Sequence, residues 1–341
     1  IRHKDKRFVG MCRHFLKKEG GFRFVLPGRV NNPSHGPVLY RGPGAVRDAV
    51  ASACCGRGSD CYEHTKRNHD MNVHGKTMVV TGGGSGIGRE LVLALLQRGA
   101  RVAAVDLNEK TLKETLELAG EAGDRVSLHT LDITDKAAVD KLPGQVKEKL
   151  GEVDGLVNNA GIIQPFLKVN NLDFDAINKV MNVNLDGVFY MTKAFLPRLL
   201  ERPEAHLVNV SSMGGFLPVP GQSIYGASKA AVKLFSEGLY AELLNTNVRV
   251  TTVFPGAIAT NISSNSGVGT SEEKSETEDD QGGDFNPMPA GKAAQVILKA
   301  IEKDRFRVMV GKDARFMDLI YRLNPRFATR YITKKMASLL N

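Results

Sequence analysis

The sequence lacks any apolar run close to the roughly 18 residues that a membrane-spanning helix needs, so we expect no such helix. The hydrophobic content of 42% is ordinary for a globular protein, and 341 residues can form one large domain or two small ones. Cysteine is missing beyond Cys61. The rest of the chain therefore needs no disulfide and fits a reducing compartment, so we expect a cytoplasmic protein.

Residues 1–70 lack a lasting period of 2 or 3.6 and show no signal-peptide pattern. They hold 14 Lys and Arg against 6 Asp and Glu, so their net charge of +8 leaves only +1 of the total +9 for the other residues. The basic excess therefore gives no reason to expect nucleic-acid binding elsewhere. We expect an irregular basic extension that is disordered or not native, produced by a misassigned reading frame ahead of Met71. An Arg-rich organelle transit peptide is the alternative.

A standard zinc-binding spacing is missing too. Cys55, Cys61, His64 and His69 lie close together in the sequence but match no known finger, and Cys54 directly precedes Cys55. We therefore predict no metal site.

From Lys76 onward, strand-like apolar runs alternate with amphipathic helical patterns. This alternation predicts right-handed crossovers and a parallel sheet that is covered on both faces. Strands are expected at residues 77–81, 101–106, 125–132, 153–158, 206–211, 248–254 and 307–310. Helices are expected at residues 87–98, 109–119, 135–150, 172–200, 223–245 and 290–303. One domain over residues 71–314 accounts for all of these elements.

Two stretches depart from this order. Residues 261–289 are polar and partly acidic, which predicts a mobile loop beside the substrate, although a plain surface insertion explains its acidic half equally well. Residues 315–341 carry apolar side chains at helical spacing among Arg and Lys, which predicts an amphipathic basic helical extension. We expect this extension to pack on a partner subunit, and peripheral contact with a membrane is the alternative.

A glycine-rich turn, TGGGSGIG at residues 81–88, follows the first expected strand and precedes a helix. Glycines let the backbone approach a pyrophosphate closely, and a helix N-terminus offers free N–H groups to phosphates. The spacing of Gly82, Gly86 and Gly88 differs from the generic dinucleotide fingerprint, so an ordinary structural turn is the alternative.

Two carboxylates end the next strands. Asp106 stands about 20 residues beyond the glycines, where it would accept hydrogen bonds from both adenosine ribose hydroxyls and repel a 2′-phosphate. This predicts NAD rather than NADP, and a helix-capping acid is the alternative. Asp132 is expected to reach the adenine amino group, with Ile133 beside the ring.

Tyr225 and Lys229 stand four residues apart on an expected helix, so both project from one face. Ser212 precedes Tyr225 by 13 residues and follows a strand-like run, while Asn184 lies within an expected helix. A tyrosine and a lysine at this spacing are common by chance. The pair becomes informative only together with the other motifs.

Taken in order, these motifs resemble the classical short-chain dehydrogenase/reductase (SDR) family. The matching motifs are TGGGSGIG at 81–88, Asp132, NNAG at 158–161, Asn184, Ser212, YGASK at 225–229, and Pro255-Gly256 followed by Thr260. The resemblance covers residues 74–310. It implies a Rossmann-type doubly wound α/β/α fold with strand order 3-2-1-4-5-6-7, and a homodimer or homotetramer built on the helices near 172–200 and 223–245.

The resemblance also implies an NAD(H)-dependent oxidoreductase acting on a secondary alcohol or ketone, with Tyr225 as acid/base. Lys229 and the positive nicotinamide ring would lower the pKa of Tyr225, Ser212 would hold the substrate oxygen, and Asn184 would hold a proton-relaying water. The expected cofactor-binding residues are Gly82, Ser85, Gly86, Ile87, Gly88, Asp106, Asp132, Ile133, Asn159, Ala160, Gly161, Tyr225, Lys229, Pro255, Gly256 and Thr260.

Substrate contacts are expected from Ser212, Met213, Phe216 and Tyr225. The side chains expected to face the pocket are apolar and suggest a hydrophobic substrate: Ile163, Phe166, Met213, Phe216, Leu217, Val219 and Ile258. The alternatives are a non-catalytic NAD-binding redox sensor and an NADP-using carbonyl reductase. A nucleotide-sugar epimerase also uses Tyr and Lys, but with another glycine spacing and a larger C-terminal domain.

Overall fold

The computed structural model describes residues 71–268 and 287–336. By its backbone contacts the chain divides after Lys66, and every described residue lies in the unit that follows. The expected N-terminal extension, the acidic half of the expected loop, and residues 337–341 lie outside the described residues.

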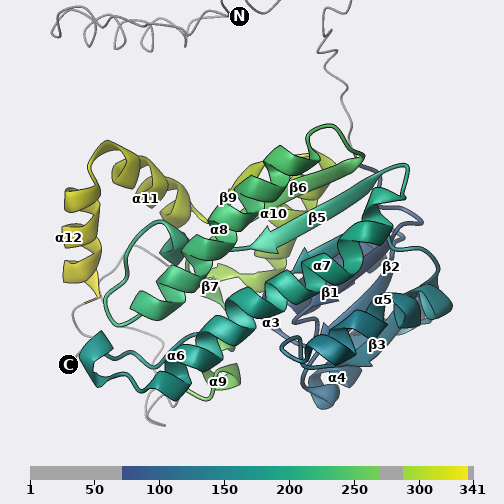
Figure 1. Cartoon of the computed structure of the whole chain (residues 1–341), viewed down its shortest axis with the longest axis horizontal. Helices are drawn as coiled ribbons and strands as arrows, with labels where there is room; N and C mark the ends of the chain where they lie inside the picture. The colour runs from purple at the N-terminus through teal and green to yellow at the C-terminus, as the bar shows by residue number, and fades with distance from the viewer. Residues whose placement is uncertain (1–70, 269–286, 337–341) are drawn as a thin grey trace, which may run out of the picture. The chain divides into compact units, whose positions relative to one another are not determined.

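One sheet of seven parallel strands forms the centre of the described structure, in the order β3-β2-β1-β4-β5-β6-β9 (Figure 1). These strands are β1 (Thr77–Thr81), β2 (Arg101–Asp106), β3 (Val126–Thr130), β4 (Gly155–Asn158), β5 (Ala205–Val210), β6 (Val248–Pro255) and β9 (Arg307–Val310). A separate short pair joins β7 (Ile258–Ala259) and β8 (Met288–Pro289). The predicted order 3-2-1-4-5-6-7 is confirmed, with β9 as the seventh strand.

Helices cover both faces of the sheet, with α5, α7 and α8 in front of it and α3 and α10 behind it in Figure 1. The helices are α3 (Gly86–Gln97), α4 (Glu109–Ala119), α5 (Lys136–Leu150), α6 (Phe174–Met181), α7 (Gly187–Leu200), α8 (Ser223–Leu243), α9 (Ile262–Asn265), α10 (Ala290–Glu302), α11 (Lys312–Leu323) and α12 (Pro325–Lys335). This doubly wound arrangement confirms the predicted Rossmann-type fold.

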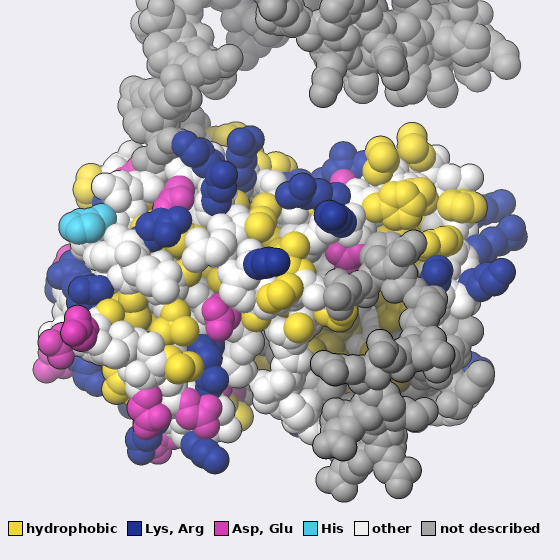
Figure 2. Space-filling view, turned by 180° about the vertical axis from the view of Figure 1, so that it is seen from behind, with side chains coloured by type: hydrophobic (Ala, Val, Ile, Leu, Met, Phe, Trp, Pro, Cys, Tyr) yellow, Lys and Arg dark blue, Asp and Glu magenta, His cyan; other side chains and the backbone are white. Residues whose placement is uncertain are grey.

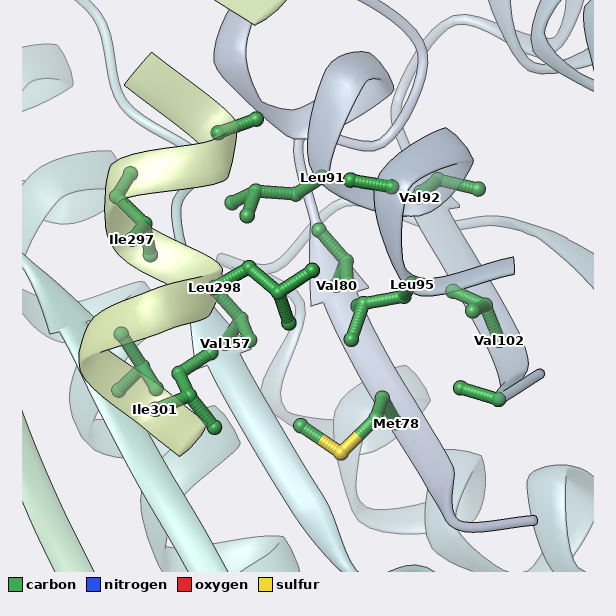
Figure 3. Close-up of a cluster of buried hydrophobic side chains, with 14 of the residues drawn as sticks. Met78, Val80, Leu91, Val92, Leu95, Val102, Val157, Ile297, Leu298 and Ile301 are labelled. Carbon is green, nitrogen blue, oxygen red and sulfur yellow. The ribbon is translucent and has the colours of Figure 1, made fainter. Parts of the chain in front are cut away.

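The two faces of β1 show why both helix layers are needed. Met78 and Val80 belong to one core cluster and Val79 to the other, and all three are fully buried. In Figure 3, Leu95 and Leu298 extend from their helices toward Met78 and Val80. A strand buried on both sides explains the continuous apolar runs in the sequence.

The helix expected over residues 172–200 runs from Phe174 to Leu200 and contains one irregular turn. A π-helical turn at Asn182–Asp186 separates α6 from α7. Asn184 is fully buried, and its side chain bonds the backbone of Ile162 on a neighbouring segment. Such a turn holds one residue more than an α-helical turn, and it re-aims the side chain that it carries.

The C-terminal extension is two helices rather than one, and it begins at Lys312. Pro325 opens α12, where its missing N–H costs nothing, and the Asn324 side chain accepts a hydrogen bond of 3.0 Å from the N–H of Phe327. The dipeptide Asn324-Pro325 is therefore a sequence signal for the end of one helix and the start of the next.

We expect a chain that starts at Met71 to keep the thermal stability and cofactor affinity of the full chain. Met71 and Val73 are only 3% and 2% exposed and pack in the first core cluster, so the fold needs residues from Met71 onward. Thermal unfolding with and without cofactor measures both properties.

A chain that starts at Lys76 is the matched control. It loses the buried Met71 and Val73 side chains and should be about 3–6 kcal/mol less stable. A large drop in melting temperature on removal of residues 1–70 alone would contradict the prediction.

Candidate active site

The glycine-rich turn lies at the carboxyl end of β1, beside the point where the strand order reverses between β1 and β4. Gly82 and Gly86 have φ angles of +68° and +51°, which side chains rarely adopt. A Cβ at Gly88 would collide with the Gly82 carbonyl oxygen. Ser85 caps α3 without a side-chain hydrogen bond, so its own hydroxyl leaves the N–H groups of the first turn free to bind an anion.

Residues from β2, α3 and α4 hold this turn in place. The Gly84 N–H donates to Asp106 Oδ2 at 2.9 Å, and Arg89 Nε donates to the Gly84 carbonyl oxygen at 2.9 Å. Thr115 Oγ1 donates to the Gly83 carbonyl oxygen at 3.0 Å. The sequence analysis identified Asp106 from its place at the end of a strand. It missed Arg89 and Thr115, since no motif marks these two helical positions.

Asp132 and Ile133 lie just beyond the end of β3, since the strand ends two residues earlier than expected. β3 ends at Thr130, and Asp132 Oδ1 accepts hydrogen bonds from the N–H and hydroxyl of Thr134, which shapes the turn before α5. Ile133 is 8% exposed and packs in the second core cluster against Gly187. Ile133 is therefore mainly a core residue, and the adenine contact of the exposed Asp132 stays a prediction.

The NNAG segment joins β4 to β1. The N–H groups of Asn159 and Ala160 both donate to Thr81 Oγ1 at 3.0 Å, and Asn159 Nδ2 donates to the Thr81 carbonyl oxygen at 2.9 Å. A Cβ on Gly161 would lie 2.9 Å from Lys229 Nζ. The segment therefore lies between the glycine-rich turn and α8.

Ser212, Tyr225 and Lys229 meet at the carboxyl end of β5. A Cβ on Gly214 would lie 3.3 Å from the Tyr225 ring and 3.5 Å from Ser212 Oγ, so these two side chains lie close together. Lys229 Nζ donates to the Val210 carbonyl oxygen at 3.1 Å. A Cβ on Gly161 would lie 2.9 Å from Lys229 Nζ and 3.1 Å from Asn184 Oδ1, so the structure brings together all four residues to which the sequence analysis gave catalytic roles.

Burial shifts both titrating groups toward their neutral forms. It raises the pKa of Tyr225 above its usual value, with the Ser212 hydrogen bond acting in the opposite direction. It lowers the pKa of Lys229 to about 8. The lowered Tyr225 pKa that the sequence analysis expected depends on Lys229 together with the nicotinamide ring of a bound cofactor, and it stays a prediction.

Asn184, the fourth expected catalytic residue, bridges two segments. Its Oδ1 accepts from the Ile162 N–H at 2.8 Å, and its Nδ2 donates to the Ile162 carbonyl oxygen and to Ser228 Oγ. These bonds tie the chain after NNAG to α8. The proton-relaying water expected at Asn184 stays a prediction.

Gln164 is a buried residue that the sequence analysis missed. Its Oε1 accepts hydrogen bonds from the N–H groups of Ile224 and Tyr225 at 2.8 and 3.0 Å, and its Nε2 donates to the Gly221 carbonyl oxygen. It therefore caps the first turn of α8 from a segment about 60 residues away. No local spacing reveals such a cap.

The chain after β6 packs over the glycine-rich turn. A Cβ on Gly86 would lie 3.2 Å from Thr260, and Asn265 Nδ2 donates to Ser85 Oγ at 2.8 Å. The Ala257 N–H donates to Asp313 Oδ2 at 2.6 Å, so the start of α11 fixes the segment after Pro255-Gly256. The sequence analysis missed Asp313 as well.

The apolar residues expected around the substrate divide into two groups. Leu217 is fully buried with Met317, Ala328 and Ile332, so it is core rather than pocket. Met213 and Phe216 are partly buried against the same cluster. Their substrate contacts stay predictions, as do those of Ile163, Phe166, Val219 and Ile258.

A family model described as short chain dehydrogenase matches residues 76–269. The chain belongs to the SDR family. The oxidoreductase SadH of Mycobacterium tuberculosis is 36% identical over 254 residues, which cover 74% of this chain and 92% of SadH. This membership confirms the resemblance read from the motifs.

Two solved SDR structures resemble the chain throughout their length. One from Burkholderia phymatum, in complex with NAD, has a TM-score of 0.65 at 27% identity and covers 74% of this chain and 96% of its own. One from Burkholderia cenocepacia, in complex with NADP, has a TM-score of 0.61 at 29% identity and covers 80% of this chain and 100% of its own. Since these relatives hold different cofactors, cofactor choice has to be argued from this chain's own residues.

The described residues contain no helix long and apolar enough to cross a membrane. Within the same residues, no three His, Cys, Asp or Glu side chains are grouped as metal ligands.

We expect Gln164→Ala to slow turnover by about 10- to 100-fold, because loss of its bonds lets Tyr225 move at the start of α8. The lost bonds should also reduce stability by about 1–3 kcal/mol. The KM for cofactor should change little, since Gln164 does not contact the glycine-rich turn. Steady-state kinetics and thermal unfolding measure these effects.

Gln145→Ala is the matched control, since Gln145 is exposed on α5. Its rate and stability should equal those of the unaltered protein. An unchanged turnover number in the Gln164→Ala protein would show that Tyr225 is positioned without this cap.

Proposed function

We propose that the protein is an NAD(H)-dependent oxidoreductase that interconverts a hydrophobic secondary alcohol and its ketone, with Tyr225 as acid/base. The observation that carries this proposal is the meeting of Ser212, Tyr225 and Lys229 beside the glycine-rich turn. A non-catalytic NAD-binding sensor would have no need of these two hydroxyl groups next to a buried lysine.

The residues of the glycine-rich turn fit a dinucleotide. The first turn of α3 offers N–H groups to the pyrophosphate, and Asp106 keeps lone pairs for the ribose hydroxyls while it accepts from the N–H groups of Gly84 and Asn108. Arg89, the nearby cation that could attract a 2′-phosphate, is paired with Glu114 at 2.7 Å. Asp106 and this pair favour NAD over NADP.

When bound, the cofactor supplies or accepts the hydride at the substrate carbon. The residues of the chain manage the substrate oxygen and its proton. Ser212 holds the oxygen beside the Tyr225 hydroxyl, which donates a proton to a ketone or takes one from an alcohol. Lys229 would hold the nicotinamide ribose hydroxyls while it adds positive charge near the phenol.

Burial raises the pKa of Tyr225, so the phenol is protonated at neutral pH and can donate to a ketone. Its use as a base for alcohol oxidation requires removal of that proton first, either at higher pH or with positive charge from the cofactor.

We also propose a homodimer or homotetramer through α6, α7 and α8, as in the family resemblance. Phe174 on α6 is 80% exposed, and Leu234 on α8 is 69% exposed. Large exposed side chains on these helices support such a contact.

The cofactor assignment is tested with a pair of substitutions at Asp106. Asp106→Ala should weaken NAD binding by at least about tenfold and narrow the preference over NADP, because it removes both the negative charge and the hydrogen bond to Gly84. Asp106→Asn keeps an acceptor and removes only the charge, so it should mainly improve NADP binding. Fluorescence titration with each cofactor gives the affinities, and an unaltered protein that already prefers NADP would refute the assignment.

The mechanism is tested with Tyr225→Phe, which removes one hydroxyl and keeps the ring. The turnover rate should fall by about 10²- to 10⁴-fold, as expected for a lost proton-transfer group, while cofactor affinity is retained. Lys229→Met should reduce both rate and cofactor affinity, since Lys229 has two roles. Ser212→Ala should reduce rate with NAD affinity nearly intact.

The pH dependence gives an independent readout of the same group. Because burial raises the pKa of Tyr225, alcohol oxidation should increase with pH above neutral, whereas ketone reduction should be level at neutral pH and decrease at high pH as the phenol loses its proton. Initial rates in both directions measure this. Near-normal turnover by the Tyr225→Phe protein on a confirmed substrate would overturn the mechanism.

A further inference from the structure

The two C-terminal helices, α11 and α12, form a unit that we call the C-terminal pair. Its inner side packs on the segment after Ser212, where Met317, Ala328 and Ile332 are buried against Leu217. Phe216 contacts Tyr321, with ring centroids 6.3 Å apart. The pair is therefore attached firmly to the domain through this side.

The outer side of the pair is apolar to an unusual degree. Phe316, Leu319, Leu323 and Phe327 are 46%, 57%, 76% and 52% exposed. Figure 2 shows hydrophobic side chains gathered beside Lys and Arg at the upper right, the side on which α11 and α12 lie in this reversed view. Scattered single apolar residues are normal on surfaces, but a group of four on two adjacent helices indicates a contact surface.

Positive charge surrounds these side chains. Residues 312–335 hold seven Lys and Arg against two Asp, a net charge of +5. Both acids are engaged on the inner side, since Asp313 accepts from the Ala257 N–H and Asp318 pairs with Arg307 and Arg322. Within residues 71–268 and 287–336, no acidic side chain pairs with Arg315, Arg326 or Arg330, all of which are exposed.

We propose that the outer side of the C-terminal pair docks on the surface of an anionic lipid bilayer. Phenylalanine and leucine would enter the boundary between headgroups and acyl chains, while arginine and lysine meet the lipid phosphates. The helices lie on the surface in this arrangement and do not span the bilayer, in agreement with their short and polar sequences. The proposal does not depend on the reaction catalysed.

The charge distribution favours lipid over a second copy of this chain, which the sequence analysis expected. A symmetric contact centred on the pair would bring the same cationic surface of each copy together, and like charges oppose such a contact. The other candidate is this chain's own segment of residues 269–286, which holds seven acids and one lysine. The test below therefore includes a result that would identify a second copy and a result that would identify residues 269–286.

The test is cosedimentation of the full chain with vesicles of phosphatidylcholine, with and without phosphatidylserine. We expect binding to the anionic vesicles that weakens as salt is raised, and little binding to phosphatidylcholine alone. The double change Arg326→Glu with Arg330→Glu should weaken binding by at least roughly 30-fold. Leu323→Ser with Phe327→Ser should weaken it by about tenfold or more at unchanged charge.

Matched controls lie far along the chain from the pair. Lys110→Glu with Lys141→Glu makes the same change of charge on α4 and α5, and Leu118→Ser removes an exposed leucine on α4. These proteins should bind vesicles as the unaltered chain does. Every variant retains residues 1–70, so any contribution from that basic segment is common to all.

Three results would overturn the proposal. One is equal vesicle binding by the Arg326/Arg330 variant and its control. Another is a change of assembly size in the Leu323/Phe327 variant without any vesicle binding by the unaltered chain, which identifies a second copy as the occupant. The third is vesicle binding that appears only after the acids of residues 272–284 are changed to amides, which identifies that segment. Melting temperatures confirm folding, and Leu323→Ser alone replaces the double variant if that one unfolds.

Discussion

A buried hydroxyl group, on Thr81, links the two halves of the sheet where β1 and β4 end, next to the glycine-rich turn and the NNAG segment. Thr81 Oγ1 accepts the N–H groups of Asn159 and Ala160, and Thr81 itself ends the strand that leads into the glycine-rich turn. In a doubly wound sheet the strand order reverses here and leaves a crevice outside the carboxyl ends of the strands. Because these bonds are partly buried, loss of the Thr81 hydroxyl group would leave two backbone donors unpaired, which costs more than the bonds themselves contribute.

The position of the catalytic helix follows from this junction. Directly after NNAG, the N–H of Ile162 donates to the Asn184 side chain, and the Gln164 side chain accepts from the N–H of Tyr225 in the first turn of α8. The short segment from NNAG to Gln164 therefore fixes the position of Tyr225 relative to Gly82, although 143 residues separate these two residues in the sequence. Lys229 is buried beside the same segment, where its Nζ donates to a carbonyl oxygen, and this burial lowers its pKa to about 8.

Features that depend on local pattern were predictable from the sequence, and features that depend on distant partners were not. An apolar run predicts strand β1, and the spacing of the glycines predicts the turn after it. The buried role of Gln164 depends on contacts with residues about 60 positions away, so no periodicity could reveal it. The π-helical turn at Asn184 looks like ordinary helix in sequence because its extra residue changes no apolar spacing within one turn. Asn324-Pro325, by contrast, was a local signal.

Leu217 shows how the packing of the segment after Ser212 depends on the C-terminal helices. An apolar residue soon after Ser212 looks like part of a pocket, but its side chain is buried by residues about 100 positions later in α11 and α12. Phe216 in the same segment is held between Phe254 of β6 and Tyr321 of α11. Tyr225 and Lys229, by contrast, are fixed by β5, α8 and the NNAG segment. A change in how α11 and α12 pack would therefore move the segment after Ser212 while the hydrogen bonds that place Tyr225 and Lys229 remain.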